Sequence, residues 1–328
     1  MRGSGIYGGV KRLRRSLLVS FASSLVNVVF IFFLSVLSCV NGSVKEVELV
    51  GVYEKLGRWS IDVVYQAPLD DQQIRGVVFL AHGCSHSATD FWPASATCPG
   101  CIGLPVERAI VKESLSRGYI TIAQSSRNRK RKCWDHHDMP LAEYTIDWAL
   151  RRWNLPGNAF IHLMGASSGG SFVGKFALRS LQEGNLPFKL TSTVIQIMPV
   201  IIARATFPLN QKIPGILFVH MKRDERSAAQ ISATVARAAS SSIKEIIVNP
   251  LKIYPQFFYE HGKHLSKNDS SVLVSALTTA GYIEKESRLL LSDPRGSAWR
   301  TVVKTTLPHI VPLIDDLEAD RSGISELM

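Results

Sequence analysis

Runs of hydrophobic residues divide most of the chain into short segments whose type can be predicted. Residues 59–67 (WSIDVVYQA) alternate polar and apolar side chains, which is typical of a half-buried strand. Continuous apolar runs predict buried strands at 76–83, 119–126, 158–167, 191–199, 214–221 and 243–254. Apolar residues at helical spacing predict helices at 140–153, 169–182 and 225–239. Because buried strands alternate with helices, the pattern favours an α/β fold with a mostly parallel sheet and helices on both faces.

The pattern changes after the last predicted strand. Residues 270–282 (SSVLVSALTTAGY) predict another helix, and no further strand is evident. We therefore expect a folded domain over residues 45–328 whose final part, at about 265–328, is helical.

A long apolar segment precedes this domain. Residues 16–40 carry no charged side chain and, as a helix, would extend roughly 36 Å, against about 30 Å for a bilayer core. Basic residues at 1–15 predict a cytoplasmic N-terminus, and so a single-pass signal anchor with the domain in the lumen or outside the cell. The alternative is a signal peptide cleaved near residues 40–42, which would make the protein secreted.

Composition and charge narrow the possible partners. The chain is 46% hydrophobic and 20% charged, as in globular proteins, and its net charge is +11. Two short basic runs, at residues 2–15 and 127–132, hold almost all of that charge. Because no aromatic residues are interleaved with the second run, we expect no nucleic-acid partner. A solvated loop is the first interpretation of this run, and contact with an acidic substrate or an anionic surface is the second.

Four cysteines lie within fifty residues: Cys84, Cys98, Cys101 and Cys133. In a non-reducing compartment they predict two disulfides, with three possible pairings. Reduced structural cysteines are an alternative, and a zinc site is a weaker one because no second closely spaced pair follows. We expect no metal and no organic cofactor.

The stretch HLMGASSGGS (162–171) contains the strongest chemical motif. Gly165-Ala166-Ser167-Ser168-Gly169 fits G-x-S-x-G and lies between a predicted strand and a predicted helix. In such a nucleophile elbow the serine has a strained backbone, so the residues two positions away must be small. Ser167 is therefore the candidate nucleophile.

A second motif, His82-Gly83, follows an early strand, where an oxyanion loop would be expected. The backbone N–H of Ser168, together with that of Gly83 or Cys84, could receive the developing negative charge. Downstream on the same loop, His86, Asp90, Phe91 and Trp92 either line a substrate pocket or serve packing.

Asp224 follows a later strand and either orients a catalytic histidine or caps the next helix. In this order the motifs resemble the α/β-hydrolase superfamily over roughly residues 45–255, and the cysteine-bearing loop resembles that of plant and algal members. The resemblance implies that Ser167 attacks an acyl carbon while Asp224 holds a histidine.

The identity of that histidine is the open question. The superfamily order is Ser, Asp, His, and His261 follows the last predicted strand at a plausible distance. His264 and His309 are alternatives, and the chain could lack the base altogether. The sequence therefore predicts a membrane-anchored serine hydrolase of carboxylesterase or lipase type. It would act on an ester, thioester or amide of a small-molecule or lipid-like acyl substrate. The alternative is a hydrolase-like receptor or scaffold without catalysis.

Overall fold

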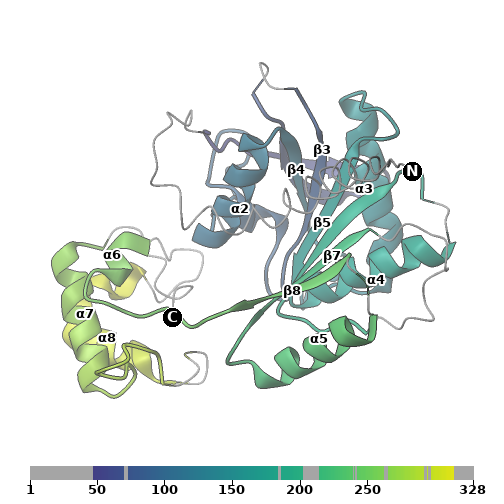
Figure 1. The fold of residues 1–328 in the computed structure, drawn as a ribbon. Helices are drawn as coiled ribbons and strands as arrows, with labels where there is room; N and C mark the ends of the chain where they lie inside the picture. Colours follow the sequence, from purple (N-terminus) through teal and green to yellow (C-terminus); the bar gives the residue numbers. More distant parts are fainter. Residues whose placement is uncertain are drawn as a thin grey trace, which may run out of the picture. The chain divides into compact units, whose positions relative to one another are not determined.

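The computed structural model describes residues 47–69, 73–183, 186–201, 214–238, 240, 242–261, 265–291, 294 and 297–313. Its centre is an eight-stranded sheet in the order β1-β2-β4-β3-β5-β6-β7-β8 (Figure 1). The strands are β1 (Val52–Leu56), β2 (Ile61–Gln66), β3 (Gly76–Ala81), β4 (Tyr119–Gln124), β5 (Phe160–Ala166), β6 (Leu190–Gln196), β7 (Gly215–Met221) and β8 (Ile243–Val248).

Six of the eight strands are parallel. β1 pairs antiparallel with β2, and β2 pairs antiparallel with β4. From β4 through β3, β5, β6 and β7 to β8 every pairing is parallel. The carboxyl ends of these six strands therefore meet at one edge of the sheet, which is where ligands bind in open α/β folds.

Helices pack on the sheet and form its hydrophobic core. They are α2 (Pro105–Ser116), α3 (Met139–Arg152), α4 (Ser168–Glu183) and α5 (Glu225–Ala238). Side chains of α3, α4 and α5 share one buried cluster with Phe79, Leu163 and Phe218 of the sheet. α2 contributes nothing to that cluster and lies on the other face (Figure 1). The prediction of a mostly parallel sheet with helices on both faces is confirmed.

The last described part of the chain is helical. It contains α6 (Phe257–His261), α7 (Lys267–Thr279), α8 (Trp299–Thr306) and the 3₁₀ helix η5 (Pro308–Leu313). These elements have a buried cluster of their own, with Phe258, Leu273 and Trp299 among its least exposed members. Burying large aromatic and aliphatic side chains in this way is the main source of stability for such a group of short helices.

β1, α2 and the short helix α6 escaped the sequence-based prediction. β1 and α2 carry too few apolar residues in a regular pattern, because β1 alternates half-buried and exposed positions and α2 buries only a narrow stripe. β8 ends at Val248, whereas the apolar run predicted a strand to residue 254. Two further 3₁₀ helices, η1 (Ala88–Phe91) and η2 (His136–Asp138), lie in the connections after β3 and β4.

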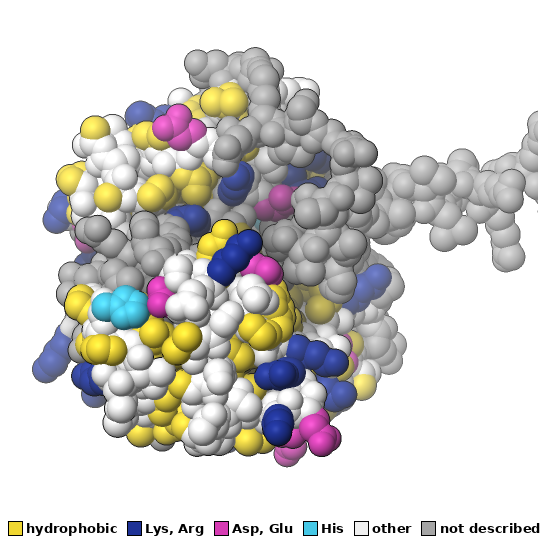
Figure 2. Space-filling model, turned by 90° about the vertical axis from the view of Figure 1, so that its left-hand side faces the viewer, with side chains coloured by type: hydrophobic (Ala, Val, Ile, Leu, Met, Phe, Trp, Pro, Cys, Tyr) yellow, Lys and Arg dark blue, Asp and Glu magenta, His cyan; other side chains and the backbone are white. Residues whose placement is uncertain are grey.

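The predicted membrane segment, residues 16–40, lies outside the described residues, as does the basic stretch before it. Among the helices that the structure does describe, none has the length and apolar character needed to cross a bilayer. Figure 2 shows one face of the molecule, on which Lys and Arg side chains lie among hydrophobic and uncharged ones. On the described part of that face the net positive charge does not form one continuous basic surface.

Candidate active site

Ser167 occupies the sharp turn between β5 and α4. Its φ is +52°, in the left-handed region that residues with a side chain rarely adopt. A non-glycine residue in such a region costs of order 1–3 kcal/mol and tends to occur where function requires it. The turn is fixed on both sides, because the Ser167 N–H donates to the Gln196 carbonyl (3.1 Å) and the Ser167 carbonyl accepts from the Ser171 N–H (2.9 Å).

Two glycines make this turn possible. A Cβ atom on Gly165 would lie 2.4 Å from the backbone of Gly169. A Cβ atom on Gly169 would lie 2.2 Å from the Ala81 carbonyl oxygen and 2.5 Å from that of His82. Both distances are shorter than any real carbon–oxygen contact, so β5, α4 and the end of β3 can approach only because these residues lack side chains. The G-x-S-x-G motif thus has the elbow geometry that its sequence predicted.

His82 organises the start of the loop after β3. Its Nε2 accepts from the Ser126 N–H (3.0 Å), so the ring proton is on Nδ1, which donates to the Gly83 carbonyl (2.6 Å). Burial lowers the pKa of His82 to about 4, so the ring is neutral at physiological pH. His82 therefore joins the β3 loop to the β4 loop and fixes the peptide group between Gly83 and Cys84.

Fixing that peptide group also fixes an N–H donor. In a trans peptide the N–H points away from the carbonyl, so the Cys84 N–H points away from His82. Among the described residues no acceptor takes the Cys84 N–H. An ideal Cβ on Gly83 would lie 3.8 Å from Ser167 Cβ, which brings this loop close to the elbow. Two of the three predicted oxyanion residues thus adjoin Ser167, since Ser168 begins α4 directly after it and Gly83 lies beside it. The third, Cys84, follows Gly83 in the same loop.

The loop after β3 contains two disulfides, one of which joins it to the loop after β4. Cys84 pairs with Cys133, and Cys98 pairs with Cys101, which confirms the prediction of two disulfides and selects one of the three pairings. The Cys84–Cys133 bond joins the loop after β3 to the loop after β4, and the Ser85 N–H donates to the Arg131 carbonyl (3.2 Å) beside it.

The basic run belongs to the second of these loops. Within it, Arg129 forms an ion pair with Asp62 (2.7 Å), and the Arg127 N–H donates to Asp138 Oδ1 (2.6 Å). The Arg129 guanidinium is about half exposed, at 48% of its side-chain surface, as expected for a solvated loop.

The other predicted pocket residues divide into two pairs. His86 and Asp90 form an ion pair in which His86 Nδ1 lies 2.7 Å from Asp90 Oδ2. Phe91 and Trp92 are 6% and 0% exposed, and the Trp92 indole N–H donates to Gln66 Oε1 (3.0 Å). The structure thus gives Phe91 and Trp92 the packing role, because their rings fill the space between the loop and the sheet.

Asp224 ends the connection from β7 and caps α5. Its Oδ1 accepts from the Ser227 N–H (3.1 Å), and its carbonyl accepts from the Ala228 N–H (2.8 Å). The side chain is exposed. This is the helix-capping geometry that was the alternative interpretation of Asp224. Its role as the orienter of a histidine stays a prediction.

Two of the three histidines predicted after the last strand are described. His261 ends α6, stacks on Phe257 (4.4 Å between ring centres) and hydrogen-bonds the Phe257 carbonyl through Nδ1 (2.9 Å). His309 pairs with Asp269 of α7 (3.2 Å) and is 61% exposed. His264 lies outside the described residues. Neither described histidine hydrogen-bonds Ser167, whose Oγ makes no hydrogen bond to any described residue.

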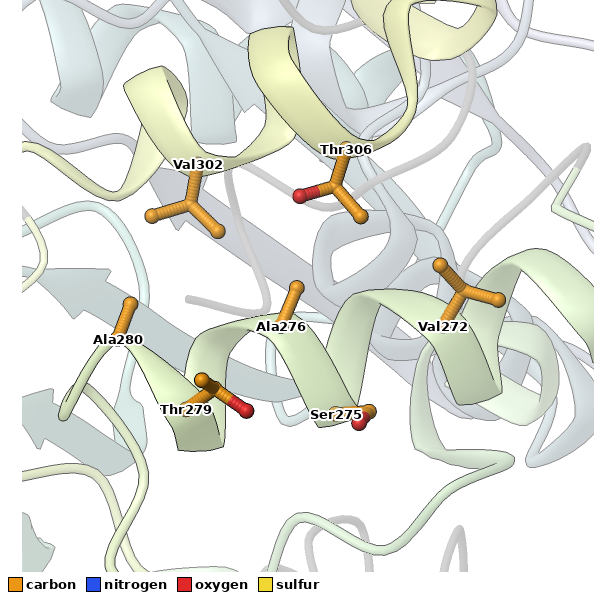
Figure 3. Close-up of a pocket in the computed structure, with 7 residues that line it drawn as sticks. All are labelled: Val272, Ser275, Ala276, Thr279, Ala280, Val302 and Thr306. Carbon is orange, nitrogen blue, oxygen red and sulfur yellow. The ribbon is translucent and has the colours of Figure 1, made fainter.

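Two other features, a groove and a small cluster of possible metal ligands, are weaker candidates for a functional site. A groove between α7 and α8 is lined by small and uncharged side chains, with Val302 and Thr306 pointing toward Ala276 (Figure 3). None of the described residues that line it is an acid, a base or a histidine. Asp135, His136 and His137 could together approach a metal ion, but all three are exposed.

The sheet order and the elbow together decide the architecture. A serine with positive φ sits between a central parallel strand and the following helix, opposite a His-Gly loop at the end of β3. The chain has the α/β-hydrolase fold. The fold implied by the sequence resemblance is therefore confirmed, and the nucleophile elbow occupies its expected place in it.

Comparisons with known proteins give matches of low similarity to solved structures. No protein-family model matches the chain, and no similar sequence was found among curated proteins. A thermostable esterase is 15% identical over 68% of this chain, with a TM-score of 0.41. Because the match covers 58% of that esterase, the chain corresponds to little more than half of its length. A soluble variant of monoglyceride lipase from Saccharomyces cerevisiae is 11% identical (65% of this chain, 90% of that one, TM-score 0.42).

A serine hydrolase homologue from Coxiella burnetii is 15% identical, over 68% of this chain and 94% of its own, with a TM-score of 0.40. All three TM-scores are below 0.5, so they give no information on substrate, and the chemistry has to be inferred from this chain's own residues.

Proposed function

We propose that the protein is a serine hydrolase in which Ser167 attacks the acyl carbon of an ester, thioester or amide. The observation that carries the proposal is the backbone of Ser167. A serine is held at φ +52° by flanking glycines that cannot be replaced without a clash. A simple turn at this position could use glycine at Ser167 itself, which would avoid the strain. Keeping a side chain in a strained turn is explained by the need to present its hydroxyl.

The surroundings of Ser167 suit charge stabilisation. The first N–H groups of α4 have no partner within the helix, and the positive end of the helix dipole lies at Ser168. Together with the Cys84 N–H, they would receive the oxyanion of a tetrahedral intermediate. Each such donor contributes about 2.7–4 kcal/mol to the transition state.

The finer parts of the proposal rest on the sequence. We propose a small-molecule or lipid-like acyl substrate, as for a carboxylesterase or lipase, and a membrane anchor at residues 16–40 with the domain on the luminal or outer side. The two disulfides support a non-reducing compartment. Secretion after signal cleavage is the alternative location.

A fluorophosphonate probe tests the central claim. The full chain, purified in mild detergent, should form a covalent adduct that maps to Ser167, and Ser167→Ala should abolish it. Ser171→Ala is the matched control, since Ser171 lies one turn further along α4, and it should label like the wild type. If the wild type labels no more than Ser167→Ala, the hydrolase proposal is wrong.

The second candidate function is a receptor or scaffold that keeps the fold without catalysis. It is favoured by the absence of a hydrogen bond between Ser167 Oγ and any described histidine. Failure of the probe with an intact, folded protein would favour this candidate.

A further inference from the structure

Most of the described histidines are buried, paired with other residues or on other loops. His82 and His162 are buried and neutral, since burial lowers the pKa of each to about 4. The Nε2 of His220 is paired with Glu245 (3.0 Å) in the core. His261 and His309 make their contacts with the C-terminal helices, through the Phe257 carbonyl and Asp269 respectively. His136 and His137 are exposed on the loop after β4. The remaining described histidine, His86, lies on the oxyanion loop itself.

The side chains of His86 and Ser167 both lie near Gly83. An ideal Cβ on Gly83 would lie 3.7 Å from His86 Cδ2 and 3.8 Å from Ser167 Cβ. Both side chains therefore border the space beside Gly83. Cδ2, the imidazole atom that lies nearest this point, is bonded directly to Nε2.

The opposite edge of the ring is held by a carboxylate. Asp90 Oδ2 lies 2.7 Å from His86 Nδ1, and Asp90 is only 5% exposed. Asp90 is fixed in turn by Ser87, whose N–H donates to Oδ2 (3.2 Å) and whose hydroxyl donates to Oδ1 (3.0 Å). An ionised carboxylate on Nδ1 keeps the proton there and leaves the lone pair on Nε2, which no described group occupies. A base whose orientation is fixed by an acid is the arrangement that activates a serine.

We propose that His86 is the general base of Ser167 and that Asp90 is its positioning residue. The inference rests on the proposed hydrolase function and names its missing base. Nε2 takes the Ser167 hydroxyl proton as Oγ bonds to the acyl carbon, and the carbonyl electrons move to the oxygen facing Cys84 and Ser168. The bond to the leaving group then breaks, and the leaving group takes the proton from Nε2.

Deacylation follows the same path. His86 removes a proton from water, whose oxygen bonds to the acyl carbon, and the ester bond to Ser167 breaks as Oγ regains the proton. Because Ser167 Oγ and His86 are not hydrogen-bonded in the free protein, the ring must move closer when substrate binds. Catalytic hydrogen bonds are often long in free enzymes and shorten in the complex.

The charges around His86 give the inference a distinct pH signature. The hydrogen bond with Asp90 raises the pKa of His86 above its usual value, against the effect of burial. Burial alone would raise the pKa of Asp90, but hydrogen bonds from His86 and Ser87 lower it. Glu107 of α2 also favours the charged imidazole, whereas Lys132 of the β4 loop opposes it. Because a base must be neutral, activity should increase as pH rises through the raised pKa of His86.

The test measures hydrolysis of p-nitrophenyl acetate by the full chain in detergent. His86→Gln keeps a hydrogen-bonding group near Asp90 but removes the base, and it should lower kcat/KM by on the order of 10²–10⁴-fold. His86→Ala should regain part of its activity when free imidazole is added, because the added ring can fill the vacated space. Asp90→Asn should move the acidic limb of kcat/KM to lower pH.

Matched variants separate this base from its rivals. His136→Gln removes an exposed imidazole from the neighbouring loop and should leave kcat/KM unchanged, as should His261→Gln, His264→Gln and His309→Gln. If the wild type is active while His86→Gln keeps its rate within about threefold, the base is misassigned but the hydrolase proposal survives. A structural role for His86 would also contradict the assignment. It would be indicated if His86→Gln is slow, free imidazole does not restore activity to His86→Ala, and Asp90→Asn leaves the acidic limb of the kcat/KM profile at the same pH. No activity in the wild type above Ser167→Ala would overturn the proposed function, and the base with it.

Discussion

Replacing Gly169 with alanine is the sharpest test of the elbow, because two physical effects predict opposite signs. Gly169 lies in the first turn of α4, where alanine should stabilise the helix by about 1 kcal/mol through its greater helix propensity. The packing predicts the reverse. The added Cβ would lie 2.2 Å from the Ala81 carbonyl oxygen and 2.5 Å from that of His82.

The magnitude follows from what the Cβ would meet. Overpacking a core typically costs about 1–3 kcal/mol and occasionally more. Here the opposing atoms are backbone oxygens at the end of β3, which cannot rotate away as a side chain could, so we expect a cost of about 3 kcal/mol. After the propensity gain, the net loss is about 2 kcal/mol. For a domain of this size that corresponds to a fall in Tm of roughly 4–8 °C.

The assay is thermal unfolding of the full chain in detergent, followed by circular dichroism, with Gly157→Ala as the matched control. A Cβ on Gly157 would meet nothing within 4 Å, so its Tm should stay within about 2 °C of the wild type. Fluorophosphonate labelling of Ser167 in Gly169→Ala should also slow, because the β3 loop must shift. A Tm for Gly169→Ala equal to or above the wild type would show that propensity outweighs packing and that the elbow is not sterically enforced.

Three further predictions concern the disulfide, acid and the membrane. Cys84→Ser with Cys133→Ser should lower stability by about 2–4 kcal/mol, because the bond closes a loop with a sequence separation of 49; chemical unfolding measures this, and an unchanged midpoint would contradict it. Unfolded histidines bind protons near pH 6.5, whereas the pKa values of folded His82 and His162 are about 4. Tm should therefore fall as pH drops from about 6.5 to about 4, and a pH-independent Tm would count against their neutral state. The full chain should stay in the pellet after alkaline carbonate extraction, and its release would argue against an anchor at residues 16–40.

The order of strands and helices was largely predictable from the sequence. Strands buried on both faces must be apolar throughout, and helices on a sheet must be apolar on one stripe, so β3, β5 and α4 are visible as patterns. Among the elements that were missed, β1 and α2 are partly exposed at the surface and so need few apolar residues. The elbow was also predictable, since its two glycines and its serine lie within five consecutive residues of the chain.

What the tertiary structure decided is which distant residues meet. A pattern at positions 82–92 cannot show that Trp92 is buried while His86 and Ser167 border the same space, because that depends on how the loop folds over the sheet. The pairing of Cys84 with Cys133 and the capping geometry of Asp224 were open for the same reason. Sequence determines local geometry through backbone sterics and periodicity, whereas a catalytic group forms only where separate loops come together at the edge of a sheet. The candidate nucleophile Ser167 could therefore be predicted from the chain alone, while its candidate base could be proposed only from the folded structure.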